Sequence, residues 1–177
     1  WDQVSRTDPS TTRDFQGKGG FKATTVCAQA QKKRATEIWG PMGVAWGLID
    51  ETFSVLVLDP NDPHQSMLVY SATLYFPVEV EGGERGGKIG VCSCTDLFNY
   101  SRKFKTWSTD NDPHKKVRTD AMTKGLSELG FNSDIFEGKF DDNKYVQAQK
   151  KREADENGEA PKTATPPAEQ PKSEMPK

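Results

Sequence analysis

The chain has 177 residues, with 24 lysines and arginines against 26 aspartates and glutamates and a formal net charge of -2. This length predicts one domain plus a tail, and the balanced charge excludes a globally basic protein. A protein of this composition that binds a polyanion must therefore gather its cations on one part of its surface. The mean hydropathy is -0.79. No apolar run is long enough to cross a bilayer, so we expect no membrane association.

The N-terminal part of the chain predicts an irregular arm, residues 1–22, followed by a first helix, residues 23–39. Thr24 or Thr25 would cap this helix. The helix carries a basic triplet of Lys32, Lys33 and Arg34. Such a triplet is often only a solvated helix face, so on its own it does not indicate a ligand.

Four strand-like runs follow, and their order predicts an antiparallel meander. They are residues 44–50, 53–59, 67–80 and 88–98. Only Glu51 and Thr52 separate the first two runs, which predicts a tight hairpin, and residues 81–87 predict a mobile loop. Because helical segments flank these strands, the expected fold class is α+β, an antiparallel β-meander packed by helices.

The cysteines are Cys27, Cys92 and Cys94. An odd number with a single C-x-C pair does not predict a disulfide scaffold. We therefore expect reduced, mostly buried thiols in a cytoplasmic protein. Cys92 and Cys94 would share one face of a strand. The alternative is a metal site, to which only His64 and His114 could add histidine ligands.

Residues 99–111 interleave cations with aromatic rings. The cations are Arg102, Lys103 and Lys105, and the rings are Tyr100, Phe104 and Trp107. This combination suits single-stranded nucleic acid, because cations follow the backbone and flat rings stack on bases. The alternative interpretation is an ordinary loop with an aromatic anchor.

Residues 112–130 predict the clearest helix of the chain. Pro113 suits the first helical position, Asp112 would cap the free amides, and Gly130 is a natural stop. The face expected to pack on the sheet comprises Val117, Ala121, Met122, Gly125, Leu126 and Leu129. Arg118 falls within this apolar arc. Its guanidinium must therefore find an anion, either a nearby aspartate or a phosphate.

The C-terminal end becomes a mixture of proline, alanine, lysine, glutamate and threonine that cannot bury a core. We therefore expect an arm over residues 1–22, a core domain over 23–146 and a disordered tail over 147–177. The first ten residues of this tail could extend a helix.

Two stretches of the chain resemble the single-strand annealing recombinases. The first contains Thr119-Asp120, Lys124, Leu126 and Gly130 at their mutual spacings, followed by Asp142-x-x-Tyr145. The second, A-T-E-I-W-G-P-M-G-V-A-W over residues 35–46, is similar to the helix-to-strand passage that opens that fold. The family is the Rad fifty-two superfamily, especially its phage-encoded members of the Red-beta, RecT and Erf group. The resemblance covers about residues 23–146.

This resemblance implies ATP-independent binding of single-stranded DNA and annealing of complementary strands in recombination and repair. It also implies a homo-oligomeric ring or filament in a bacterial host cell, with no cofactor, metal or catalytic residue. A single-strand-binding protein or an exonuclease would be a further partner. The candidate DNA-binding residues are Lys32, Lys33, Arg34, Arg102, Lys103, Lys105, Lys115, Lys116, Arg118 and Lys144.

Two other functions remain open. Glu137-x-Lys139 has the form that some metal-dependent nucleases pair with an upstream aspartate, here Asp120 or Asp134. Two such carboxylates could hold Mg²⁺ while the lysine steadies the attacked phosphate. The other alternative is a protein-interaction domain that does not bind DNA.

Overall fold

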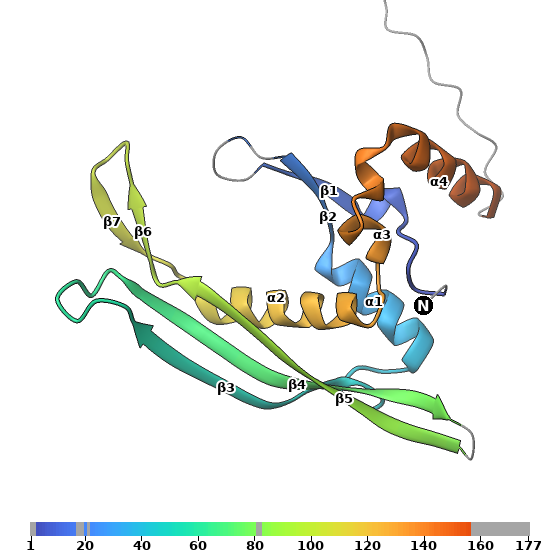
Figure 1. Ribbon diagram of the computed structural model, residues 1–177, viewed down its shortest axis with the longest axis horizontal. Helices are drawn as coiled ribbons and strands as arrows, with labels where there is room; N and C mark the ends of the chain where they lie inside the picture. The colour runs from blue at the N-terminus through green and yellow to red at the C-terminus, as the bar shows by residue number, and fades with distance from the viewer. Residues whose placement is uncertain (1–2, 17–19, 21, 81–82, 157–177) are drawn as a thin grey trace, which may run out of the picture.

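The centre of the fold is an antiparallel meander of three long strands, β3 (Gly47–Val57), β4 (Ser66–Val80) and β5 (Gly83–Asp96). Helix α2 (Pro113–Glu128) lies across one face of this sheet (Figure 1). The computed structural model describes residues 3–16, 20, 22–80 and 83–156. The fold is thus α+β, an antiparallel meander packed by helices, as predicted.

Strand β3 is one continuous strand, so the predicted hairpin at Glu51 and Thr52 is wrong. The pairing of β3 with β4 shifts register between Ile49 and Thr52, and Asp50 has a left-handed φ of 55°. An extra residue at this position forms a β-bulge, which bends a strand without reversing it. The bulge therefore turns two expected strands into one edge strand.

Strand β5 begins earlier than predicted, because residues 83–87 pair with residues 76–80 of β4. This part of the expected loop is therefore strand, while residues 81–82 lie outside the described residues. Along β5, Val91 and Ser93 are buried, whereas Cys92 and Cys94 are exposed. The expectation of mostly buried thiols is thus wrong for this pair, because strand alternation turns both away from α2.

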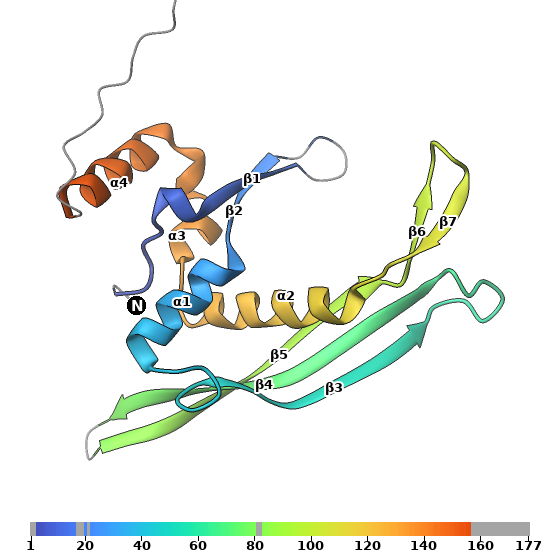
Figure 2. The same ribbon diagram turned by 180° about the vertical axis from the view of Figure 1, so that it is seen from behind.

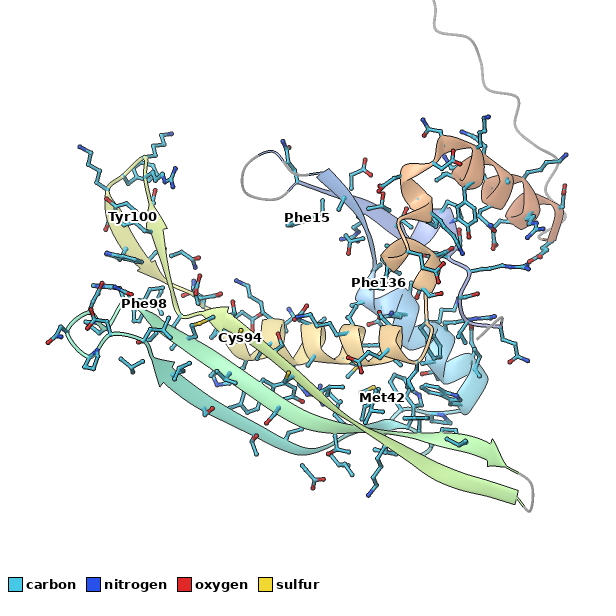
Figure 3. All side chains as sticks on the ribbon, viewed as in Figure 1. Phe15, Met42, Cys94, Phe98, Tyr100 and Phe136 are labelled. Carbon is cyan, nitrogen blue, oxygen red and sulfur yellow. The ribbon has the colours of Figure 1, made fainter. Side chains whose placement is uncertain are left out.

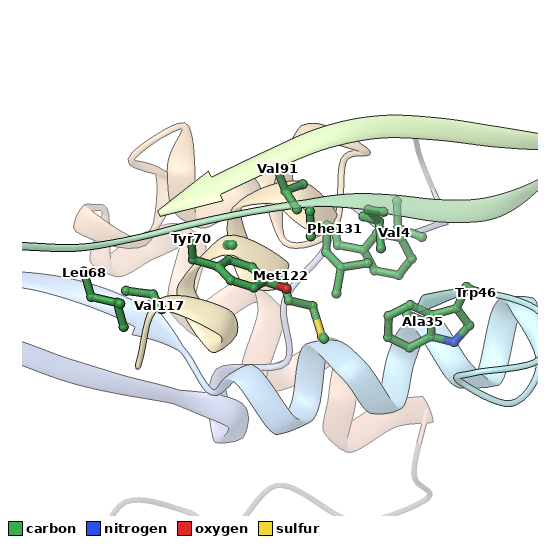
Figure 4. Packing of buried hydrophobic residues seen from close by; sticks show 13 residues of the cluster. Val4, Ala35, Trp46, Leu68, Tyr70, Val91, Val117, Met122 and Phe131 are labelled. Carbon is green, nitrogen blue, oxygen red and sulfur yellow. The ribbon is translucent and has the colours of Figure 1, made fainter. Parts of the chain in front are cut away.

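The sequence prediction for α2 is confirmed in its extent and its buried face. Pro113 occupies the first turn, and Gly130 follows the helix with a φ of 94°. Asp112 makes no side-chain capping hydrogen bond, so that detail of the prediction is wrong. A Cβ at Gly125 would lie 2.5 Å from Val91 Cγ1, which shows how closely α2 approaches the sheet. Figure 4 shows the core, formed by Leu68, Tyr70, Val91, Val117, Met122 and their neighbours.

Helix α1 (Ala28–Trp39) packs on α2 near the C-terminal end of that helix (Figure 2), and its last residue, Trp39, stacks on Phe76 of β4 at 5.6 Å. It begins later than predicted, because Lys22–Val26 forms strand β2, which pairs with β1 (Thr12–Gln16). The expectation of irregular structure is therefore wrong for Thr12–Gln16, and the expected capping by Thr24 or Thr25 is wrong because both lie in β2. A run of β-branched residues favours a strand once a partner strand is present.

The C-terminal part of the described chain comprises α3 (Ser133–Phe136), the 3-10 turn Lys139–Asp141 and α4 (Asn143–Glu156). The first ten residues of the expected tail, 147–156, are helical, which is the helix extension that the sequence analysis allowed, and residues 157–177 lie outside the described residues. The N-terminal segment packs against this region, since Asn132 N–H donates to Val4 O at 2.9 Å.

Candidate nucleic-acid interface

The basic and aromatic connector forms a hairpin of two short strands, β6 (Phe98–Ser101) and β7 (Thr106–Thr109). It rises from one end of the sheet and stands away from α2 (Figures 1 and 2). Backbone bonds hold its base, since Leu97 N–H donates to Ser66 O at 2.9 Å and Asp110 N–H donates to Leu97 O at 2.8 Å. The connector is therefore a defined arm rather than a loose loop.

The tip of the hairpin presents three cations. Arg102, Lys103 and Lys105 are all exposed, and none forms an ion pair with a carboxylate of the described chain. Lys105 adopts a left-handed φ of 49°, where glycine and asparagine are the usual residues. A lysine at such a position stores a small backbone strain.

The aromatic residues of the hairpin divide into two kinds. The Trp107 ring stacks on the His64 ring, with a centroid distance of 4.7 Å and an interplanar angle of 15°. The Tyr100 ring lies against the other partner of that stack, Trp107, with a centroid distance of 5.1 Å and an interplanar angle of 56°. The Phe98 ring meets His64 edge-on at 5.3 Å, near the sheet, while Tyr100 lies further along the hairpin (Figure 3). Trp107 is therefore an anchor that joins the hairpin to the turn between β3 and β4.

Phe104 differs from this anchor, because it is 70% exposed at the tip of the hairpin. Its ring has the Lys103 ammonium 5.3 Å from its centroid, and such a cation–π contact leaves the other ring face open. The two interpretations of residues 99–111, an aromatic anchor and a nucleic-acid-binding segment, thus describe different residues of the same hairpin. Trp107 is the anchor, and Phe104 offers a free ring beside free cations.

Helix α2 places its first cations next to the base of the hairpin, where each has a carboxylate partner. Lys115 Nζ lies 3.4 Å from Asp112 Oδ2, and Lys116 Nζ lies 2.5 Å from Asp110 Oδ2. The hydrogen bond from Lys116 lowers the pKa of Asp110. The Lys115–Asp112 pair is exposed on both sides and therefore weak, whereas the Asp110 side chain that binds Lys116 is only 6% exposed.

Arg118 has an internal carboxylate partner, and that partner comes from β3 rather than from a nearby aspartate. Its Nε and Nη2 donate to the Glu51 carboxylate at 2.7 and 3.1 Å, and Tyr70 Oη donates to Glu51 Oε2 at 2.7 Å. The Arg118 hydrogen bond lowers the pKa of Glu51, while burial and Glu51 raise the pKa of Tyr70. Arg118 is therefore occupied by a structural ion pair.

The basic triplet of α1 lies apart from the hairpin, on the other side of α2 (Figures 1 and 2). Lys32 is half-buried, whereas Lys33 and Arg34 both lie near Glu37 Oε atoms, at 3.7 and 3.8 Å. Arg34 Nη2 also donates to Gln3 O at 2.9 Å. Lys144 is exposed at the start of α4. The ten predicted residues thus form separate groups rather than one track within a subunit.

The residues of the nuclease hypothesis are engaged elsewhere. Asp134 is buried and accepts hydrogen bonds from Thr7 N–H (2.9 Å), Thr7 Oγ1 (2.5 Å) and Tyr145 Oη (2.9 Å). Asp120 accepts from Ser93 Oγ at 2.6 Å and pairs with Lys124, while Glu137 pairs with Lys139. Within the described ranges, no group of three histidine, cysteine or carboxylate side chains could hold a metal ion.

Sequence reasoning missed the role of His64 at this interface. Its D-P-H context indicates only a turn, and Asp62 accepts from the His64 backbone N–H at 3.1 Å in that turn. Its stacking on Trp107 depends on the register of β4 with β5, which brings distant segments together. The turn before β4 contains no phenylalanine, tyrosine or tryptophan, so the sequence carried no signal for this contact.

No protein-family model matches the chain, and no curated protein does either. Among the helices that the structure describes, none is both long and apolar enough to span a membrane.

Proposed function

We propose that the protein binds single-stranded DNA without ATP and anneals complementary strands, in the cytoplasm of a bacterial host cell. The observation that carries this proposal is the β6–β7 hairpin, which joins three cations that pair with no carboxylate of the described residues to an exposed Phe104 ring. Cations that follow a phosphate backbone and a ring that stacks on any base are the two elements of sequence-independent single-strand binding. Duplex DNA hides the base faces that such a ring needs.

Annealing needs no bond chemistry, because the matched duplex itself is the stable product. A protein that holds two backbones and leaves the base edges free promotes it. A near-neutral subunit can do this best as an oligomer, in which the hairpins of neighbouring subunits form one continuous cationic surface. The proposal therefore includes a ring or filament, as the sequence resemblance implies.

The edges of the central sheet support self-association. β3 and β5 are the outer strands of the meander, and Val55, Leu56, Val57 and Leu58 are 49–59% exposed at the β3 edge. Residues 53–58 at this edge carry no charged side chain, and an uncharged, apolar stretch of an edge strand is a template for pairing with another chain. The same edge would serve a different protein partner, which is the observation that favours the protein-interaction alternative.

Fluorescence polarisation with a labelled oligothymidylate, across a salt series and without ATP, tests the proposal. We expect binding that weakens steeply with salt and exceeds binding to a duplex of equal length. Replacing Arg102, Lys103 and Lys105 with glutamine should reduce the slope of log K against log salt by about 2, since each phosphate contact contributes roughly 0.7. Glutamine at Lys88, Lys150 and Lys151, three exposed lysines elsewhere, is the control of equal charge.

The outcomes separate the three hypotheses. No binding at low salt by a folded protein would refute the DNA-binding proposal and favour a protein-interaction domain. Cleavage of the labelled strand that requires Mg²⁺ would support a nuclease instead. Binding, together with an increased rate of pairing between two labelled complementary strands, would support annealing. Sedimentation analysis of the wild type and of Val55→Asp/Val57→Asp would test self-association at β3.

A further inference from the structure

A cavity of about 630 Å³ lies between the N-terminal segment, α1 and α4, and charged side chains line it. From α1 come Lys33 and Arg34, two of the predicted DNA-binding residues. From α4 come Glu153 and Glu156. The α1 cations therefore face the acidic residues of a C-terminal helix across an open space.

Helix α4 separates its charges between two faces. Gln149, Glu153 and Glu156 line the cavity together with Arg152, at the spacing of a single helix face. The other lysines and acids of α4 lie outside this face and are exposed; they are Lys144, Lys150, Lys151 and Asp155. The helix thus presents Glu153 and Glu156, with Arg152 beside them, to the cavity and its lysines to solvent.

Helix α4 is fixed to the body by its first half. Tyr145 Oη donates to the buried Asp134, and Gln149 is buried. Burial and Asp134 together raise the pKa of Tyr145 to about 12. Further along, Glu153 is half-buried and Glu156 is exposed, and neither forms an ion pair with a described residue. The second half of α4 is therefore held over the cavity by weaker, longer-range forces.

The charges around Glu153 act on its carboxylate in opposite directions. Burial, Asp8 and Glu156 raise the pKa of Glu153, whereas Arg34 across the cavity lowers it. The attraction between the α4 glutamates and the α1 cations thus competes with repulsion among three carboxylates. A contact balanced in this way can open at a small free-energy cost.

We propose that the second half of α4 is an autoinhibitory arm, whose Glu153 and Glu156 compete with DNA phosphates for Lys33 and Arg34. This inference rests on the proposed single-strand binding and adds a regulation of that site. With α4 in place, Lys33 and Arg34 face its glutamates across the cavity in addition to Glu37 of their own helix, and the hairpin alone meets the strand. A strand that reaches α1 displaces the arm and gains two more phosphate contacts.

Binding of the full chain to a labelled oligothymidylate of about 30 nucleotides, longer than one typical site, tests this arm. We expect Glu153→Gln/Glu156→Gln to bind about three- to tenfold more tightly at low salt, because charge–charge attraction across an open, solvated space is weak. The slope of log K against log salt should steepen by about 1.4, which is two further contacts at roughly 0.7 each. Asp155→Asn/Glu128→Gln removes two exposed carboxylates that do not line the cavity, and should bind like the wild type.

A second pair of substitutions locates the gain. Adding Lys33→Gln/Arg34→Gln to Glu153→Gln/Glu156→Gln should abolish the tighter binding if it comes through α1. Hydrogen exchange of residues 150–156 in the wild type should increase when the oligothymidylate is added, because the arm is displaced.

The results distinguish failure of the arm from failure of DNA binding. A wild type that binds, with both double variants equal to it in affinity and slope, would refute the arm and leave the proposed function standing. Equal gains in the two double variants would also refute it, because a general charge effect would explain both. No binding by any variant would refute the proposed function and the arm with it. Binding by Glu153→Gln/Glu156→Gln alone would support complete autoinhibition.

Discussion

Replacing Phe104 with alanine tests whether the hairpin contacts bases as well as phosphates. The Phe104 ring is 70% exposed, and the Lys103 ammonium makes a cation–π contact with it, 5.3 Å from the ring centroid. Removing it should change the free energy of unfolding by less than about 0.5 kcal/mol, as for most surface positions. Stacking of one base on an aromatic ring contributes about 1–3 kcal/mol. We therefore expect the dissociation constant for oligothymidylate to rise by a factor of about 5 to 150.

The assay compares two ligands and two control variants. Fluorescence polarisation should show the loss with oligothymidylate, and a much smaller loss with an abasic strand that has phosphates but no bases. Phe104→Leu keeps apolar area and loses the π face, so it should behave like alanine. Phe136→Ala removes a ring that is 58% exposed on α3, and it should bind like the wild type.

A different result would contradict the stacking argument. If Phe104→Ala binds oligothymidylate within about twofold of the wild type while glutamine at the three hairpin cations weakens binding, the hairpin contacts only the backbone. Trp107→Ala is expected to act through the fold instead, because it removes the stack on His64. It should lower hairpin stability by about 1 kcal/mol and leave the intrinsic stacking of Phe104 in place.

Three further predictions concern stability. Gly125→Ala should lower the free energy of unfolding in urea by about 1–3 kcal/mol, because the new Cβ would lie 2.5 Å from Val91 Cγ1; Gly90→Ala, with nothing within 4 Å, is its control and should change little. Glu51→Gln should cost about 1 kcal/mol at neutral pH, since its partner Arg118 is 43% exposed and the pair is screened. The folded-state pKa of Glu51 lies below its ordinary value of 4.5. This contribution is therefore complete above that value and is lost as the pH falls through the lowered pKa, so equal stability losses at pH 7 and pH 3 would contradict it. Asp134→Asn should cost about 3 kcal/mol, because the new amide cannot accept all of the bonds that the carboxylate accepts from Thr7 and Tyr145; a thermal melt that does not change would show that the network is not structural.

The parts of the fold that local signals determine could be predicted from the sequence. Pro113 at the start, Gly130 at the end and an apolar stripe between them define α2, and the structure has this helix with this buried face. The long β-branched and aromatic run of β4 was equally clear. The composition of residues 99–111 identified the hairpin side chains, because a mixture of cations and rings is visible without any partner.

Contacts between distant segments decided the remaining features. β1 and β2 stabilise each other as a pair, so neither is evident alone. The sequence of helix α4 is polar and carries no clear helix signal. The helix is fixed by the hydrogen bond from Tyr145 to the buried Asp134, and composition does not reveal that Asp134 is its partner.

The candidate interface divides in the same way. The sequence by itself determined which cations and rings the chain offers, and it left Arg118 a choice between a carboxylate and a phosphate. The tertiary structure decided that Glu51 binds Arg118, that His64 covers Trp107 and that Phe104 remains free. The physical reason is that helix caps and side-chain periodicity act over a few residues, whereas ion pairs and ring stacks depend on strand register, which only the folded sheet defines.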